Sequence, residues 1–464
     1  MASAHSAEQA FFPLDDELEL LPGSLTPSLQ EDLVHLGTWM PFGKAVQAVQ
    51  RFRYTDVSRP TVERITEAAG AAYVAYQNEG AARIQREMPE PPAGPAQLFM
   101  SADGAMVPLV GGEWAEVKTL VIGEVQPPQK VKGEQVIRTA KHSYFSRLTD
   151  AETFQRLALV ETQRRGVETA TEVAFVTDGA EWLQKFAHHH RPDAVRILDF
   201  PHAGEHIAAV GQACLGESSS AAQEWLQTQL HELKQNGPDA VLVQVAHLVA
   251  TRPQSPDLAT HLAYLEKRKA HMNYPAFLAA GLPIGDGATE SANKLVVETR
   301  LKGSGMHWTR CHVDPMLALR NIVCNDRWDE AWPQIVQTLR RQERQQRNER
   351  RQCRRAAIEV PAPHPIVPSL PVTPPVPVLA TNISSSPSTQ PLTQDTPTQP
   401  KQPWRPPANH PWRHMPVGKA RFKPTTRQTC RRRRRAVRWA PPIATRTSTW
   451  PPARPIGTGW KLWT

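Results

Sequence analysis

Cysteine is scarce in this sequence, and long apolar runs are absent. Only five of the 464 residues are cysteine and none forms a C-x-x-C pair, which argues against both a disulfide framework and a cysteine-rich zinc site. No apolar run approaches the roughly 20 residues that a membrane span requires, and the first ten residues are too polar for a signal peptide. We therefore expect a soluble protein of a reducing, intracellular compartment.

Acidic residues are nearly missing from the C-terminal part of the chain. Residues 361–464 hold 16 lysines and arginines against the single acid Asp395, whereas residues 1–360 hold 38 basic and 44 acidic residues. The same segment contains 23 of the 44 prolines, so it cannot bury enough apolar surface to offset the entropy of ordering. Its Arg431–Arg435 run, with tryptophans nearby, suits a flexible arm on a polyanion; the alternative is a solvated low-complexity end.

Shifts in composition divide the chain into five expected regions. Proline and glycine mark a linker near residues 89–94, and beyond it the apolar pattern changes from helical spacing to alternation. We expect a helical N-terminal domain over 1–88, an α/β domain over 95–202 that resumes over 283–355, a helical insertion over 203–282, and a disordered Pro/Arg-rich tail over 356–464.

The N-terminal region contains two helix-start patterns. Thr26-Pro27 and Ser58-Arg-Pro60 each place a capping residue just before a proline in the first helical turn. Apolar residues follow at helical spacing, so we expect two helices joined around residues 53–58. Such a pair is compatible with a helix-turn-helix whose second helix enters a DNA major groove, but any small helical domain gives the same pattern.

The next region changes to a strand pattern. Residues 97–105, 114–126 and 136–148 predict an antiparallel meander. Two further apolar strands, at 172–178 and 195–199, alternate with helices, which favours parallel pairing through crossover helices. The expected fold class is therefore α/β with a mixed sheet.

Three of these strands end in an acid. Asp103, Asp178 and Asp199 hold these positions, and ligands of open α/β sheets bind just beyond the carboxyl ends of strands. Carboxylates on strands about 4.8 Å apart suit two Mg²⁺ ions about 3.5–4 Å apart, the arrangement for in-line displacement at phosphorus. Asp-Gly is also a common turn dipeptide, but the repeated context of strand then Asp-Gly-Ala favours a site.

A third carboxylate is expected from the helix that begins near residue 288. At 100° per residue, Glu290, Asn293 and Lys294 share one helical face. An acid, an amide and an ammonium on one face suit a phosphate-bearing ligand better than a core. The alternative is a helix whose first turn is solvated, with Glu290 near the positive end of the helix dipole.

Together these motifs resemble those of a known family. Asp103-Gly-Ala, Asp178-Gly-Ala-Glu-Trp, Leu198-Asp199-Phe-Pro-His202 and Gly287-Ala-Thr-Glu290-Ser-Ala-Asn-Lys are similar to motifs of the DDE transposases of bacterial insertion sequences, of the ISKra type related to Mutator-like elements. The likeness spans roughly Phe11 to Trp332, and the block from Glu290 to Trp308 is its most specific part.

The resemblance implies a fold, a cofactor and a set of site residues. It implies a ribonuclease H-like catalytic domain with a helical insertion and two Mg²⁺ ions, or Mn²⁺ in their place. Asp103, Asp178 and Glu290 match the three catalytic, metal-binding acids, and Asp199 and His202 match a supporting D-x-x-H signature. The expected DNA-binding residues are Asn293, Lys294, Arg300, Lys302 and Trp308, with a place in the core as the alternative for Trp308.

The sequence thus predicts a DNA transposase that cuts the ends of its own element and joins them to target DNA. Its expected partners are double-stranded DNA and further copies of itself on that DNA, with no membrane involved. Its expected location is the bacterial cytoplasm, near the nucleoid. Two alternatives stay open: a ribonuclease H-like nuclease that does not join strands, and a decayed transposase that only binds DNA.

Overall fold

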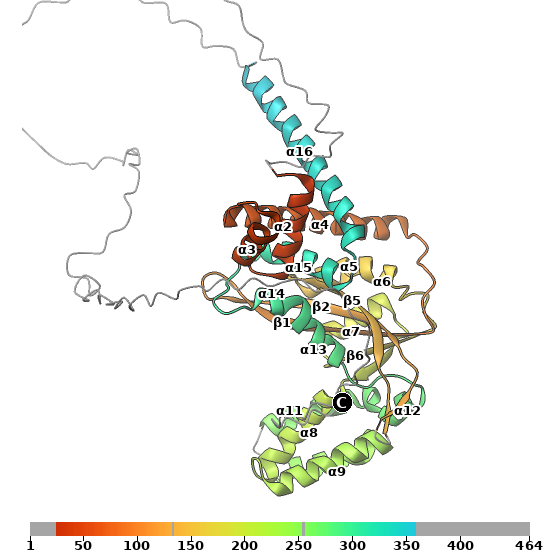
Figure 1. Ribbon diagram of the computed structural model, residues 1–464. Coiled ribbons are helices and arrows are strands. Elements are labelled where there is room, and N and C mark those ends of the chain that lie inside the picture. The colour runs from red at the N-terminus through yellow and green to blue at the C-terminus, as the bar shows by residue number, and fades with distance from the viewer. Residues whose placement is uncertain (1–24, 132–133, 253–255, 359–464) are drawn as a thin grey trace, which may run out of the picture. The chain divides into compact units, whose positions relative to one another are not determined.

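The structure of this chain is a computed structural model that describes residues 25–131, 134–252 and 256–358. Contacts group the chain into two units, Met1–Ile366 and Val367–Thr464. All described residues belong to the first unit, in which helices pack on a central sheet (Figure 1). The tail predicted over 356–464 lies outside the described residues, except for residues 356–358, which continue a helix.

The central sheet is mixed, as predicted. Its five strands lie in the order β5 (Thr139–Arg147), β2 (Trp114–Val125), β1 (Gln97–Pro108), β6 (Glu172–Thr177) and β7 (Val195–Leu198). β2 pairs antiparallel with both β1 and β5, which confirms the predicted meander. β6 pairs parallel with both β1 and β7. A separate hairpin joins β3 (Gln129–Val131) to β4 (Glu134–Val136). The predicted α/β class is therefore confirmed.

Alternation along the strands buries both faces of the sheet. Leu98, Met100 and Ala102 of β1 point to one face, where they meet Phe154 and Phe186. Those two phenylalanines come from the covering helices α5 (Ala151–Leu157) and α7 (Glu181–His190), and α6 (Leu159–Arg164) follows α5. Because α7 continues to His190, the histidine run at 188–190 belongs to a helix and not to an exposed loop.

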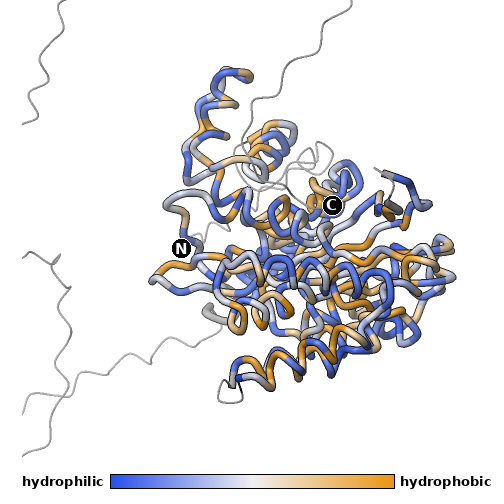
Figure 2. Tube along the Cα trace, turned by 90° about the horizontal axis from the view of Figure 1, so that it is seen from below, coloured by the Kyte–Doolittle hydropathy of each residue, from blue (hydrophilic) through white to orange (hydrophobic). Residues whose placement is uncertain are grey.

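The opposite face of the sheet packs against the helical insertion. Phe99 of β1 and Val176 of β6 share a core with Ile207 and Val245 from the insertion. The helices are α8 (Phe200–Leu215), α9 (Ser220–Asn236), α10 (Pro238–Ala250), α11 (Pro256–Lys267), the 3₁₀ turn η1 (Lys269–Met272) and α12 (Tyr274–Ala279). Figure 2 shows hydrophobic and hydrophilic residues alternating along the helices of this unit, as expected for helices with one buried face.

From residue 25, where the described part of the N-terminal region begins, the helices are α2 (Pro27–Trp39), α3 (Phe42–Arg53) and α4 (Arg59–Glu87). Thr26 and Ser58 cap α2 and α4 through their side chains, as the sequence predicts. The first predicted helix is wrong in one respect, because it breaks at Pro41 and α3 begins just after it. A proline disfavours helical backbone in the residue before it, and Met40 is accordingly extended.

The chain returns to the sheet through a helix with an irregular middle. It runs through α13 (Gly287–Ala292), the π-helical turn η2 (Asn293–Glu298) and α14 (Thr299–Leu301), and is followed by α15 (Arg310–Cys324) and α16 (Trp328–Ile358). Arg320 of α15 is fully buried and donates to the backbone carbonyls of Leu295 and Val296. The buried Arg320 side chain is therefore a hydrogen-bond donor to the backbone of the π turn.

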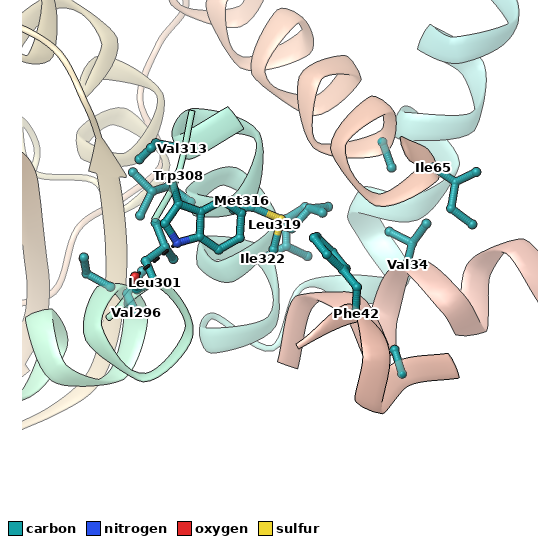
Figure 3. Close-up of a cluster of buried hydrophobic side chains, with 14 of the residues drawn as sticks. Val34, Phe42, Ile65, Val296, Leu301, Trp308, Val313, Met316, Leu319 and Ile322 are labelled. Carbon is teal, nitrogen blue, oxygen red and sulfur yellow. Dashed lines mark hydrogen bonds between the residues drawn. The ribbon is translucent and has the colours of Figure 1, made fainter. Parts of the chain in front are cut away.

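A shared core joins the N-terminal helices to this return segment. Figure 3 shows Val34, Phe42 and Ile65 of α2–α4 in one cluster with Trp308 and Met316. The closest backbone approach is at Gly70 of α4, where a Cβ atom would lie 2.2 Å from the carbonyl oxygen of Pro315 in α15. The region predicted as a separate N-terminal domain thus packs in the same unit as the sheet.

Within the described residues, no helix combines the length and the apolarity needed to cross a membrane.

The close approach of α4 and α15 gives a stability prediction. Gly70→Ala should lower the free energy of unfolding by about 1–3 kcal/mol, because the added methyl group must push two packed helices apart. Gly43→Ala in α3 is the matched control, since a Cβ atom there meets nothing within 4 Å; it should leave stability unchanged or raise it by up to about 1 kcal/mol. Urea unfolding midpoints measure both, and equal midpoints for the two variants would contradict the packing.

Candidate active site

Strand register places Asp103, Asp178 and Asp199 in one row across the sheet. The β1–β6 pairing runs from Gln97 opposite Glu172 to Met100 opposite Phe175, and the β6–β7 pairing ends with Thr177 opposite Leu198. Three residues beyond the Met100–Phe175 pair, the same register puts Asp103 opposite Asp178. One residue beyond the Thr177–Leu198 pair, it puts Asp178 opposite Asp199. Neighbouring strands lie about 4.8 Å apart, so three carboxylates gather at the carboxyl ends of β6 and β7 and beside them on β1.

Asp103 is half-buried on β1, beside other acids. Burial raises the pKa of its carboxyl group, and the nearby Asp178 and Glu116 raise it further. Hydrogen bonds from the Gly104 backbone and from the Asn293 side chain oppose this increase; Asn293 Nδ2 lies 3.0 Å from Asp103 Oδ2. The anionic form of Asp103 is therefore costly here, and a cation beside it would relieve that cost.

Asp178 follows the last residue of β6 and begins a tight turn. Its Oδ1 accepts a hydrogen bond from the Ala180 backbone at 2.9 Å. Gly179 has φ +78°, a left-handed conformation that side chains other than glycine rarely adopt. The direction of the Asp178 carboxylate is therefore coupled to the backbone of this turn.

Asp199 is buried, and both of its carboxylate oxygens accept hydrogen bonds from backbone. It is the N-cap of α8, accepting from the His202 backbone at 2.9 Å, and its other oxygen accepts from the Asp286 backbone at 2.9 Å. Burial raises its pKa and these two hydrogen bonds lower it. His202, the other residue of the D-x-x-H signature, has its Nδ1 atom 3.3 Å from Glu205 Oε2. Asp199 is therefore the residue of this signature that contacts the site.

Asp286 is a fourth acid at this site, and the sequence analysis did not single it out. Burial raises the pKa of Asp286 to about 8, with contributions from Asp199, Asp103 and Asp178. The residue lies between Gly285 and Gly287, in a segment that the sequence marked only as a break before a helix. The one sequence signal for Asp286 was its position between two glycines, a pattern that turns also contain often.

Glu290 lies about one helical turn beyond Asp286 and has a different partner. Its side chain is exposed and pairs with Lys294, Oε1 to Nζ, at 2.5 Å. No contact found among the described residues joins Glu290 to Asp103 or Asp178. The structure thus brings Asp103, Asp178, Asp199 and Asp286 together, while Glu290 is paired with Lys294.

Three of the expected DNA-binding residues lie in the interior. Asn293 is 7% exposed, Arg300 2% and Trp308 7%. Arg300 donates to the Gly37 carbonyl at 3.0 Å, and Trp308 donates to the Leu301 carbonyl at 3.1 Å (Figure 3). Buried side chains do not reach a duplex in this conformation, so these interior positions correct the expected DNA contacts.

The two expected lysines are accessible but paired. Lys294 is exposed and holds Glu290, and Lys302 is partly exposed and pairs with Glu298 at 2.6 Å. The helical-face argument fails for Asn293 alone. At 100° per residue Asn293 lies about 60° from Glu290, at the edge of that face where its side chain donates to Asp103.

The residues of the row have the donor chemistry of a divalent-cation site. Carboxylates and amide oxygens are the ligands that Mg²⁺ and Mn²⁺ prefer. Asn293 Oδ1 is buried beside Asp103 and has no hydrogen-bond partner in the structure, so it is an oxygen suited to a cation. Across residues 25–358 with their two gaps, no three His, Cys, Asp or Glu side chains form a ready metal cage, although the donor types of the row fit the cation.

A second surface of interest is the exposed side of α3. Lys44, Gln47 and Arg51 lie at helical spacing on this side and are exposed. At the end of the helix Phe52 is 76% exposed and Tyr54 91% exposed. The helix capped by Ser58, predicted to be the reading helix, is α4, and it packs against α15 and α16. The short helix α3 presents a polar, basic face to solvent.

An open groove of about 1430 Å³ lies in another part of the unit. Tyr73 and Tyr76 of α4, Arg164 of α6 and Arg344 of α16 are among its lining residues, and none of the four aspartates is. The groove is thus separate from the carboxylate row.

No protein-family model matches this chain, and a search of curated proteins finds no match. We therefore base the function on the geometry of the site and on the motifs in the sequence.

The high pKa of Asp286 predicts a pH-dependent stability. The folded protein keeps Asp286 protonated up to about pH 8, whereas an unfolded aspartate ionises near pH 4. The folded state thus binds more protons between these values, and without metal its stability should fall as pH rises from about 4 to about 8. Asp286→Asn removes this loss, so its melting temperature should exceed that of wild type by a margin that grows from pH 5 to pH 8.

Asp257→Asn, at an exposed acid of α11, is the control and should follow the wild-type pH profile. Melting curves in EDTA at several pH values measure the three proteins. A constant difference between Asp286→Asn and wild type across this range would show that Asp286 ionises normally.

Proposed function

We propose that this protein is a metal-dependent DNA transposase with a ribonuclease H-like catalytic domain. The observation that carries the proposal is the row of carboxylates, with Asp103 on β1 and Asp178 just past the end of the adjacent parallel strand β6. A mixed sheet in which an antiparallel meander precedes two parallel strands supports the ribonuclease H-like assignment. The motif resemblance supports the step from a metal-dependent nuclease to a transposase.

The roles of the residues follow from their contacts. Asp103 and Asp178 would hold the divalent ions, and Asn293 fixes the Asp103 carboxylate with one end of its amide. Asp199 ties the start of α8 to the segment that carries Asp286. When bound, two such ions neutralise charge on the attacking and leaving oxygens at phosphorus. A water molecule or a 3′-hydroxyl is the proposed nucleophile.

The third ligand has two candidates in this chain. The motif assigns Glu290, which in this conformation pairs with Lys294 and must leave it to reach the row. Asp286 already lies within electrostatic reach of Asp103 and Asp178. We propose Glu290 as the third ligand in the DNA-bound state and Asp286 as a carboxylate that supports the row through Asp199.

The partner that fits the proposal is double-stranded DNA, with the exposed side of α3 as its reading surface. This side presents Lys44, Gln47 and Arg51, side-chain types that contact phosphates and base edges. Assembly of several copies on the DNA belongs to the same proposal.

A DNA-binding protein without cleavage activity is the second candidate function. The exposed position of Glu290, apart from Asp103 and Asp178, favours it. Metal-dependent nicking of DNA distinguishes the two functions, and a strand-transfer assay then distinguishes a transposase from a nuclease that only hydrolyses.

The catalytic prediction compares four conservative variants on DNA that carries the sequences flanking the gene. Asp103→Asn and Asp178→Asn should abolish Mg²⁺-dependent cleavage and strand transfer, because each removes a charge that holds the metal while keeping the side-chain shape. Glu290→Gln should also abolish cleavage, and Asp286→Asn should only reduce it. Gel assays of nicking and joining measure the outcome, with DNA binding measured in parallel.

Asp257→Asn serves again as the control and should cleave like wild type. Cleavage by Asp103→Asn at the wild-type rate would reject the active site. An inactive Asp286→Asn beside an active Glu290→Gln would instead assign the third ligand to Asp286.

The DNA-binding prediction concerns α3. Lys44→Glu and Arg51→Glu should each weaken DNA binding and reduce the slope of log affinity against log salt by about 0.9 for each phosphate that the variant no longer neutralises. Arg156→Glu, at an exposed arginine of α5, is the charge-matched control and should retain the wild-type slope. Fluorescence anisotropy over a salt series measures the slopes, and identical slopes for all four proteins would exclude α3 as the reading surface.

A further inference from the structure

The turn that carries Asp178 is held by residues of the helical insertion. The Tyr264 hydroxyl, on α11, donates to the Asp178 carbonyl. Arg268, just past the end of α11, donates from Nε and Nη2 to the Gly179 carbonyl at 3.0 and 2.6 Å. Two consecutive carbonyls of the turn thus accept hydrogen bonds from a segment 86 to 89 residues further along the chain.

This contact leaves no room for a side chain in the turn. A Cβ atom on Gly179 would lie 2.3 Å from Arg268 Nε and 3.1 Å from the Tyr264 hydroxyl. Gly179 also has a positive φ, so glycine is needed here for two independent reasons. The Asp-Gly pair at Asp178 is therefore fitted to the insertion as well as to the turn itself.

The two clamping side chains are themselves held in place. The Arg268 guanidinium lies 3.6 Å from the centre of the Tyr264 ring, and the Tyr264 ring stacks on His206 of α8 with centres 3.8 Å apart and planes 4° apart. His206 in turn contacts His261 of α11, with their Nδ1 atoms 2.9 Å apart. A preformed stack across α8 and α11 thus sets the positions of both donors.

Asp178 needs such a clamp more than Asp103 does. Asp103 lies inside β1, and its backbone is opposite Thr119 in the antiparallel pairing with β2. Asp178 comes after the last residue of β6, so no strand pairing of its own residue fixes it. Its carboxylate is tied to its own turn through the Ala180 backbone, and the insertion holds the carbonyls of that turn.

We propose that Tyr264 and Arg268 are positioning residues that set the Asp178 carboxylate for a divalent cation, so that the helical insertion controls the metal site. This rests on the proposed function. The two residues act through the backbone of the turn and do not touch the cation. Displacing α11 relative to the sheet would move the two carbonyls and, with them, the carboxylate.

Mn²⁺ binding to the full chain tests this role, since it requires neither DNA nor turnover. Electron paramagnetic resonance of free Mn²⁺ gives the affinity of wild type, Arg268→Gln, Tyr264→Phe and Asp103→Asn. Arg268→Gln should weaken Mn²⁺ binding about tenfold or more, the usual effect of losing a partner of a metal ligand. Tyr264→Phe keeps the ring and loses one donor, so it should weaken binding less.

The matched control is Arg252→Gln. Arg252 also belongs to the insertion and also donates to a backbone carbonyl, that of Cys214 at 3.3 Å. Its loss should leave Mn²⁺ affinity at the wild-type value. Arg268→Lys restores charge and one donor but not the paired donors or the stacking, so it should bind Mn²⁺ with an affinity between those of Arg268→Gln and wild type.

The outcomes separate this role from the proposed function. If Asp103→Asn loses Mn²⁺ while Arg268→Gln and Tyr264→Phe bind it like wild type, the metal site stands and the clamp only fastens the insertion to the sheet. If Asp103→Asn binds Mn²⁺ like wild type, the metal site itself is refuted and the positioning role with it. If Arg268→Gln does not fold, Tyr264→Phe decides: weaker Mn²⁺ binding supports the role, and unchanged binding overturns it.

Discussion

The parallel register of β1, β6 and β7 brings three carboxylates into one row, and hydrogen bonds from nearby residues offset only part of the cost of their charges. Each carboxylate of the row accepts at least one hydrogen bond: Asp103 from Asn293, Asp178 from the Ala180 backbone, and Asp199 from the His202 and Asp286 backbones. Hydrogen bonds to the charged form favour ionisation. Even so, the pKa of Asp103 is raised, chiefly by burial, so the hydrogen bonds do not offset the cost of the charge.

The two ends of the helical insertion lie next to each other at the site. The chain leaves the sheet at Asp199 and returns at Asp286, and these two residues are hydrogen-bonded to each other. Phe200 and Ile284, their neighbours, also share a backbone hydrogen bond of 2.9 Å. A long helical segment is therefore added without separating the strands, because both of its ends are pinned at the edge of the carboxylate row.

Local patterns in the sequence predicted most of the elements but only part of the site. The strand alternation and the Thr26 and Ser58 caps depend on neighbouring residues, and the structure confirms both. The row of aspartates depends on strand pairings between residues that are 75 positions apart (β1 with β6) and 21 positions apart (β6 with β7). In the sequence, only the acids that recur at strand ends indicated these pairings. Asp286 was missed because its environment comes from three distant acids, and the burial of Asn293 was missed because a helical wheel does not show which edge of a face meets the sheet.

The π turn at Asn293–Glu298 has a consequence for how this site tolerates change. A π turn corresponds to an α-helix with one extra residue, and one residue corresponds to about 100° of rotation. Because the π turn takes up that residue in one wider turn, it cancels this rotation, so Asp286 and Glu290 face Arg300 as they would in a regular helix that is one residue shorter. Deleting one residue from this turn should therefore restore a regular helix and leave the facing of Asp286 and Glu290 unchanged.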